Sequence, residues 1–168
     1  MDVTIEGAHE GERASCTSTA DGQVDRCGDR EVEIMAGLAE FPVAGVLRAE
    51  DISRAKKFYT EVLGLEAMET FGPSSEGMYT AGGGTMVMLY ERPGMPAPQN
   101  TTLAFGVAAA KFDEVIDDLR AKGVVFEDYD VPEVGLKTVD GVAEYAANGV
   151  KVAWFRDTEG NIINIATM

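Results

Sequence analysis

The sequence predicts an α+β fold built from two successive βαβββ modules. Three observations lead to this prediction. A strand-like run followed by an amphipathic helical stripe occurs twice, each stripe is followed by a glycine, and a proline-rich linker separates the two copies. The spacing also agrees, because Val46 to Gly64 and Phe105 to Gly123 each span eighteen positions. A duplicated unit is the simplest account of these regularities.

The first module covers about residues 41–92. A strand is predicted at residues 41–48, and Asp51 or Ser53 is placed to accept the free backbone N–H groups of a following helix. The helix is predicted by apolar residues at three- and four-residue intervals, and Gly64 ends it. These apolar residues are Ile52, Ala55, Phe58, Tyr59, Val62 and Leu63. Strand candidates follow at residues 66–71, 77–81 and 85–91, with a glycine turn at residues 82–84.

A linker at residues 93–100 leads to the second module, which covers about residues 101–168. The linker is predicted because its three prolines are incompatible with a central strand. A strand at residues 101–107 precedes a helical stripe that Gly123 ends. The stripe consists of Phe112, Val115, Ile116 and Leu119, and the strand candidates after it are residues 124–131, 141–145, 151–155 and 162–167. The polar turn Asp157-Thr158-Glu159-Gly160-Asn161 connects the last two candidates.

Residues 1–36 are predicted to form a flexible acidic extension in front of one domain at residues 37–168. The segment is rich in Gly, Asp, Glu, Ser and Thr, and only residues 31–35 show a strand-like alternation. Both cysteines, Cys16 and Cys27, lie in it without the spacing of a metal site. We expect two reduced thiols, with a disulfide inside the extension as the alternative.

The composition favours a small molecule as partner and disfavours nucleic acid and membranes. Of the 168 residues, 45% are hydrophobic and 26% are charged, as in ordinary soluble domains, and no apolar run reaches membrane-spanning length. The formal net charge of -15 repels phosphate groups, and the basic residues are scattered rather than gathered in a stripe. The acidic start of the chain has no basic region leading into an apolar core, so a cytoplasmic location is expected.

Four short stretches carry a family resemblance when they are taken in order. They are residues 44–51, the pair Phe58-Tyr59, the helix end Leu63-Gly64-Leu65, and the turn at residues 157–161. On a duplicated pattern, this series resembles the vicinal oxygen chelate superfamily, which includes glyoxalases, bleomycin-resistance proteins and extradiol dioxygenases. The resemblance covers about residues 41–168. It implies a curved eight-stranded mixed sheet around a cleft, with the helices outside, and a homodimer.

The resemblance also locates the positions that hold a divalent metal ion in metal-dependent relatives. In those relatives a His on the first strand and a Glu on the last strand of each module bind the ion. The matching positions hold Ala44, Thr102, Met88 (or Tyr90, in another register) and Asn164. These residues do not supply the donors that Zn²⁺, Ni²⁺ or Fe²⁺ requires, and the only histidine is His9, in the extension. We therefore expect no metal and no other cofactor.

Strand alternation, in the register that the resemblance implies, leaves an apolar pocket with a few polar points. The residues expected to bind a ligand are Arg48, Met88, Tyr90, Thr102, Trp154 and Asn164. Trp154 offers a stacking face, while Arg48 or Arg156 offers a contact to an anionic or carbonyl group. The structural alternatives are that Trp154 belongs to the core and that the methionines only pack. For Arg48 the alternative is an ion pair with a carboxylate such as Glu91 or Asp157.

The sequence leaves three functions open. We favour a metal-independent protein of the glyoxalase and bleomycin-resistance type that binds a small, partly aromatic molecule in the cleft. The alternative is an enzyme of lyase, isomerase or dioxygenase type that uses Glu91, Tyr90 or another acid of the pocket in place of the lost ligands. The third is a structural or regulatory module whose extension binds a partner.

Overall fold

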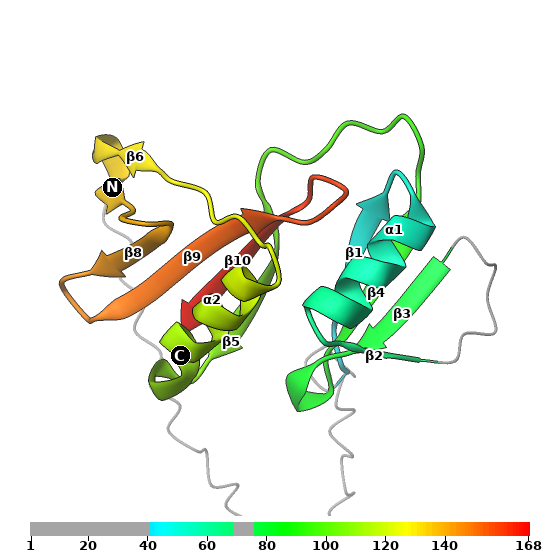
Figure 1. The fold of residues 1–168 in the computed structure, drawn as a ribbon, viewed down its shortest axis with the longest axis horizontal. Helices are drawn as coiled ribbons and strands as arrows, with labels where there is room; N and C mark the ends of the chain where they lie inside the picture. The colour runs from blue at the N-terminus through cyan, green and yellow to red at the C-terminus, as the bar shows by residue number, and fades with distance from the viewer. Residues whose placement is uncertain (1–40, 69–75) are drawn as a thin grey trace, which may run out of the picture. The chain divides into compact units, whose positions relative to one another are not determined.

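The computed structural model of the chain describes residues 41–68 and 76–168 and contains two four-stranded sheets (Figure 1). A small two-stranded sheet accompanies them. The predicted extension at residues 1–36 lies outside the described residues, and so do His9 and both cysteines. Within the described part, no helix has both the length and the apolar composition needed to cross a membrane.

The first sheet contains β1, β4, β3 and β2, in this spatial order. The bounds are β1 Ala44–Ala49, β2 Glu66–Ala67, β3 Glu76–Thr80 and β4 Met86–Glu91. β1 and β4 are parallel, whereas β2, β3 and β4 are antiparallel neighbours. A short turn at Gly82–Gly84 connects β3 to β4, as the glycine run predicts.

The helix of the first module begins and ends where the sequence predicts. It consists of α1 Ile52–Lys57 and a π-helical continuation, η2 Phe58–Val62. Asp51 is the N-cap, because its Oδ1 accepts hydrogen bonds from the N–H groups of Ser53 (2.9 Å) and Arg54 (3.0 Å). Gly64 follows the helix with a φ of 68°, a conformation that a residue with a Cβ adopts only under strain.

The second sheet repeats this topology with β5, β10, β9 and β8 in spatial order. The bounds are β5 Thr101–Val107, β8 Val142–Tyr145, β9 Val150–Arg156 and β10 Ile162–Thr167, and those of the helical segments are η4 Ala109–Lys111 and α2 Phe112–Ala121. β5 and β10 are parallel, as β1 and β4 are, and the linker at residues 93–100 contains neither helix nor strand. The predicted α+β fold of two βαβββ modules is confirmed, with its eight strands divided between two hydrogen-bonded sheets.

The strand predicted at residues 124–131 is found only in part, because β6 covers Asp130–Val131 and Phe126 forms an isolated bridge with Phe155 of β9. This part of the chain leads into a small hairpin, whose elements are β6 Asp130–Val131, the 3-10 turn η5 Pro132–Val134 and β7 Leu136–Lys137. The Asp128 carboxylate accepts hydrogen bonds from residues farther along the chain, the Thr138 hydroxyl and the Gly141 N–H, both at 2.9 Å. These bonds hold the segment in a loop, so three strands of the main sheet follow α2, as the repeat requires.

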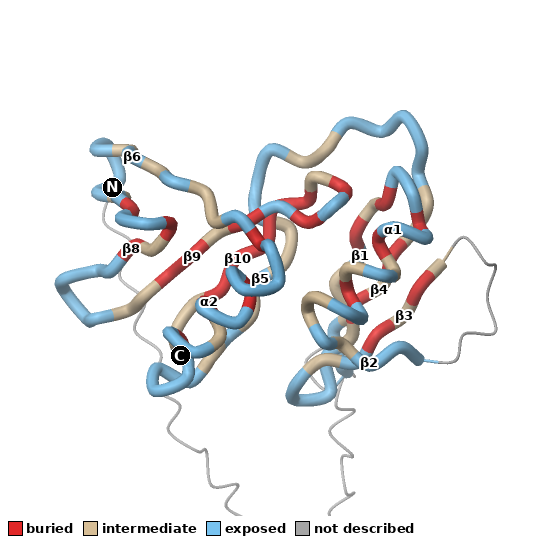
Figure 2. The backbone as a smooth tube through the Cα atoms, in the orientation of Figure 1, coloured by how far each residue is buried: buried red, intermediate tan, exposed pale blue. Residues whose placement is uncertain are grey.

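Each sheet buries one face in a hydrophobic core to which both modules contribute (Figure 2). In the first module the buried residues alternate along β1 and β4 and include Ala49 and Leu89, neither of which is exposed. In the second module Phe155 of β9 and Phe112 of α2 are equally buried. The rings of Phe58 and Phe155, with centroids 6.4 Å apart, join the two halves of this core.

Candidate functional site

Three of the residues predicted to bind a ligand share the face of the first sheet that does not enter the core. In the register of β1 and β4, Arg48 lies opposite Tyr90 and Val46 opposite Met88. Leu89, between Met88 and Tyr90, is fully buried on the other face. Met88 and Tyr90 are half-buried, and Val46 beside them is 55% exposed. This face is therefore partly open, and it carries two charged residues beside the apolar ones, Arg48 of β1 and Glu76 of β3, both opposite Tyr90.

The other three lie on the second sheet. Trp154 of β9 and Asn164 of β10 are opposite each other, and they alternate with buried residues such as Phe155. Thr102 is the extra residue where the register of β5 and β10 shifts, and its hydroxyl donates to the Ile162 carbonyl at 2.9 Å. The structure thus gathers the six predicted residues into two groups of three, one on each sheet.

Trp154 has polar neighbours that the sequence did not indicate. The ring of Tyr129 meets it edge to face, with centroids 5.5 Å apart. The Tyr129 hydroxyl donates to Glu127, whose carboxylate also accepts a hydrogen bond from Arg156 Nε at 2.7 Å. Burial, the hydrogen bond to Glu127 and the charge of Glu127 together raise the pKa of Tyr129 to about 12. Both Glu127 and Tyr129 come from the segment predicted as a strand, so their place beside Trp154 had no local signal.

Arg48 forms an ion pair with a carboxylate, which was the alternative to a role in ligand binding. Its partners are not Glu91 or Asp157, however. Nη2 contacts the carboxylate of Glu50 at 2.8 Å, and Nη1 donates to the backbone carbonyl of Glu159 at 2.7 Å. Among the described residues, Nε of Arg48 is buried without a hydrogen-bond partner.

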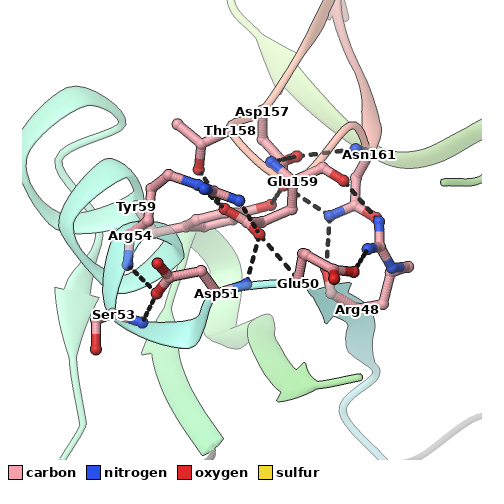
Figure 3. Close-up of polar contacts among 10 residues, drawn as sticks. All are labelled: Arg48, Glu50, Asp51, Ser53, Arg54, Tyr59, Asp157, Thr158, Glu159 and Asn161. Carbon is pink, nitrogen blue, oxygen red and sulfur yellow. Dashed lines mark hydrogen bonds and ion pairs between the residues drawn. The ribbon is translucent and has the colours of Figure 1, made fainter. Parts of the chain in front are cut away.

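The polar turn at residues 157–161, which we call the clasp, connects β9 to β10 and contacts the first module (Figure 3). Asp157 organises it, because its Oδ1 accepts from the N–H groups of Glu159 and Asn161, both at 2.8 Å. Its Oδ2 accepts from the hydroxyl of Tyr59, in η2, at 2.8 Å. Burial, followed by the charge of Asp157 and this hydrogen bond, raises the pKa of Tyr59 well above its ordinary value, so the hydroxyl remains a donor.

Glu159 makes the main contact of the clasp with the start of α1. None of its side chain is exposed, and it accepts from the N–H groups of Glu50 (2.8 Å) and Asp51 (2.9 Å). Arg54 donates to it from Nε (2.8 Å) and Nη2 (3.0 Å). Burial raises the pKa of Glu159, but hydrogen bonds from Arg54, the Asp51 N–H and the Thr158 hydroxyl outweigh it and hold the pKa below its ordinary value of 4.5.

Asn161 completes the clasp. It is fully buried, and its Nδ2 donates to the Arg48 carbonyl at 2.8 Å and to Asp157 Oδ2 at 2.7 Å. The clasp therefore connects the second module to β1 and to the start of α1 in the first module. The sequence singled out this turn as a family signature, but it gave no sign that Arg54 and Tyr59 are its partners.

The donor set at the four positions matched to metal ligands does not fit a divalent ion. Ala44 has no donor atom, Met88 offers only a thioether, and the Thr102 hydroxyl is bonded to a backbone carbonyl. Asn164 is buried, and its Nδ2 donates to the Ala153 carbonyl at 3.3 Å. Glu91 lies opposite Ala49 in the register, on the face of β4 away from Met88. In the described part of the chain, no three His, Cys, Asp or Glu side chains are grouped as metal ligands.

Comparisons with known proteins agree with the resemblance seen in the sequence. Residues 42–165 match the family model described as the Glyoxalase/Bleomycin resistance protein/Dioxygenase superfamily. None of the curated proteins matches the chain.

Solved structures with a similar fold come from several members of that superfamily. Lactoylglutathione lyase from Agrobacterium tumefaciens is 20% identical, with a TM-score of 0.55 and coverage of 74% of this chain and 91% of that one. The fosfomycin resistance protein FosX from Listeria monocytogenes is 14% identical, with a TM-score of 0.58 and coverage of 80% and 95%. A glyoxalase/dioxygenase from Nostoc punctiforme is 16% identical, with a TM-score of 0.57 and coverage of 80% and 95%. At these identities the likeness concerns the fold alone.

Proposed function

Since the chain belongs to the Glyoxalase/Bleomycin resistance protein/Dioxygenase superfamily, we propose that it binds a small, partly aromatic molecule without the help of a metal ion. One observation supports this most directly. In the first sheet one face is buried in the core, while the other is partly open and carries Met88 and Tyr90. In the second sheet the half-buried Trp154 lies on a face whose neighbours Val152 and Asn164 are buried. A half-buried apolar and aromatic surface on a rigid sheet is suited to a flat ligand.

The side chains of the proposed site have different tasks. Trp154 and Tyr90 supply aromatic faces for stacking, and Met88 supplies an adaptable apolar contact. Arg48, Thr102 and Asn164 already have protein partners, so they hold the walls of the site and contact a ligand only by exchanging those partners. The donor chemistry at the metal positions supports a function that does not require an ion.

Fluorescence of Trp154 tests the proposal, because it is the only tryptophan of the chain. Titration with nitrophenol or nitrobenzyl alcohol, which quench indole emission, is expected to give saturable quenching. Met88→Ala is expected to weaken this binding at least about fivefold, since it removes an apolar contact. Met95→Ala is the matched control, because Met95 lies in the linker and is 52% exposed. Its affinity is expected to equal that of the wild type.

Two outcomes would contradict the proposal. Linear quenching without saturation for every aromatic compound would mean that no site surrounds Trp154. The second outcome is a tightly bound, stoichiometric metal ion in the purified protein. If removal of this ion also abolished a measured lyase, isomerase or dioxygenase activity, an enzyme would be favoured instead. The cytoplasmic location and the homodimer belong to the same proposal and stay predictions.

A further inference from the structure

We propose that a second site, for a small organic cation with an apolar body, lies between the end of η2 and the helix α2. A hollow of about 330 Å³ is found there, within the range of sites that hold small molecules. Most of its lining is apolar and comes from both modules. The main contributors are Leu63, Leu65, Phe105, Val115, Leu119 and Ile165.

This hollow is separate from the site proposed above. Ile165 alternates with Asn164 along β10, and Phe105 alternates with Ala104 along β5. Side chains that alternate along a strand point to opposite faces. The hollow therefore lies on the α2 side of the second sheet, whereas Trp154 shares the other face with Asn164.

The charge of the lining determines which ligand suits it. Glu114 and Asp118 stand one turn apart on α2 and both line the hollow, and none of the described residues that line it is basic. Their side chains are 70% and 57% exposed, so the carboxylates lie at the solvent side of an apolar hollow. An ammonium group at this edge with an apolar body inside matches both features.

The ammonium group of such a ligand competes with two lysines that already contact these carboxylates, and Lys122 also donates to the carbonyl of Val62, in the lining of the hollow, at 3.4 Å. Glu114 contacts Lys111 at 2.6 Å and Asp118 contacts Lys122 at 2.7 Å, and all four side chains are exposed. Exposed pairs of this kind are weak, because water and salt screen them and the long side chains lose freedom. A cation that is also held by apolar contacts can share the carboxylates of Glu114 and Asp118 with the lysines, or replace the lysines there. The formal net charge of -15 also raises the local concentration of cations.

The probe is phenylpropylammonium, compared with phenylpropanol as its neutral analogue and phenylpropionate as its anionic one. Calorimetry on the full chain is expected to rank their affinities in the order cation, alcohol, anion. Methyl NMR is expected to show shifts at Leu63, Val115 and Leu119. Binding of the anion as tight as that of the cation, or shifts centred on Met88, would overturn the proposal.

Asp118→Asn is expected to weaken the cation about two- to fivefold, the range of an exposed ion pair, and to leave the alcohol unchanged. Asp117→Asn is the matched control, because Asp117 is on the same helix, is 75% exposed, pairs with Arg120 and does not line the hollow. Equal loss in both variants would mean that only the overall charge matters and would overturn the site.

Val115→Phe tests the apolar part of the same site. The larger ring is expected to fill the hollow and to abolish binding of both the cation and the alcohol, with folding checked by thermal unfolding. If this variant does not fold, the comparison of Asp118→Asn with Asp117→Asn still tests whether the site exists. Met88→Ala is expected to leave the affinity for the cation unchanged, so failure of the first site and failure of this one are distinguishable.

Discussion

At the scale of single residues, Glu159 carries a buried negative charge whose lost hydration is offset by Arg54 and by the N–H groups of Glu50 and Asp51. Glu159→Gln removes the charge and turns one acceptor atom into a donor that faces other donors. We expect the free energy of unfolding, measured in urea, to fall by about 2 to 4 kcal/mol. Glu61→Gln is the control, because Glu61 is 62% exposed and its pair with Lys57 is long, at 3.9 Å. Its effect is expected to stay within about 0.5 kcal/mol, and equal effects of the two would contradict the clasp.

The same carboxylate gives the stability a pH dependence of known sign. The pKa of Glu159 is lower in the folded chain than its ordinary value of 4.5, so the folded state binds fewer protons at mildly acidic pH. Its contribution is present above pH 4.5 and is lost as the pH falls through the folded pKa. Urea unfolding between pH 7 and pH 3 is expected to show a steeper loss for the wild type than for Glu159→Gln. Parallel curves would mean that the carboxylate is not held as described.

At the scale of elements, the glycine that follows η2 supports the helix end by its conformation alone. A Cβ at Gly64 would meet no atom within 4 Å, but the φ of 68° disfavours any residue that carries one. Gly64→Ala is therefore expected to lower the free energy of unfolding by about 1 kcal/mol. Gly82→Ala is the control, since that position is equally open and does not have a left-handed φ. Identical thermal midpoints for the two variants would contradict this account.

The elements show how far the sequence could predict the fold. Helix stripes, the glycines after them and the proline-rich linker are local signals, so both helices and most strands of the described chain were found. The strand predicted at residues 124–131 is found only in part, because apolar alternation there competes with hydrogen bonds that the Asp128 carboxylate accepts from donors farther along the chain. The pair Asp140-Gly141 is a strong hairpin signal in the sequence, and in the structure both residues have a positive φ between the bridged residues Val139 and Val142.

The candidate site was less predictable than the fold. Alternation correctly grouped Met88 with Tyr90 and Trp154 with Asn164, because it depends only on neighbours along a strand. The contact of Arg54 with Glu159 joins residues 105 positions apart, and no local pattern announces such a pair. Such side-chain partners depend on how the two modules pack against each other. This packing is determined by many residues together, so no short sequence pattern predicts it.

At the scale of the whole molecule, the modules are expected to unfold together. One core contains residues of both, and the clasp ties β10 to α1. Trp154 reports on the second module, whereas far-UV circular dichroism reports on all helices and strands. The two signals are expected to give coincident urea transitions. A fluorescence transition well before or after the circular dichroism transition would show that the modules unfold separately.

The clasp also bears on how the protein is made. During synthesis the first module leaves the ribosome long before residues 157–161, so the N–H groups of Glu50 and Asp51 and the guanidinium of Arg54 are available before Glu159 exists. We expect the first module to be incompletely packed until the clasp contacts it. In a chain stopped before Glu159 these groups have no partner in the clasp, and the contact forms only after the last hairpin has emerged.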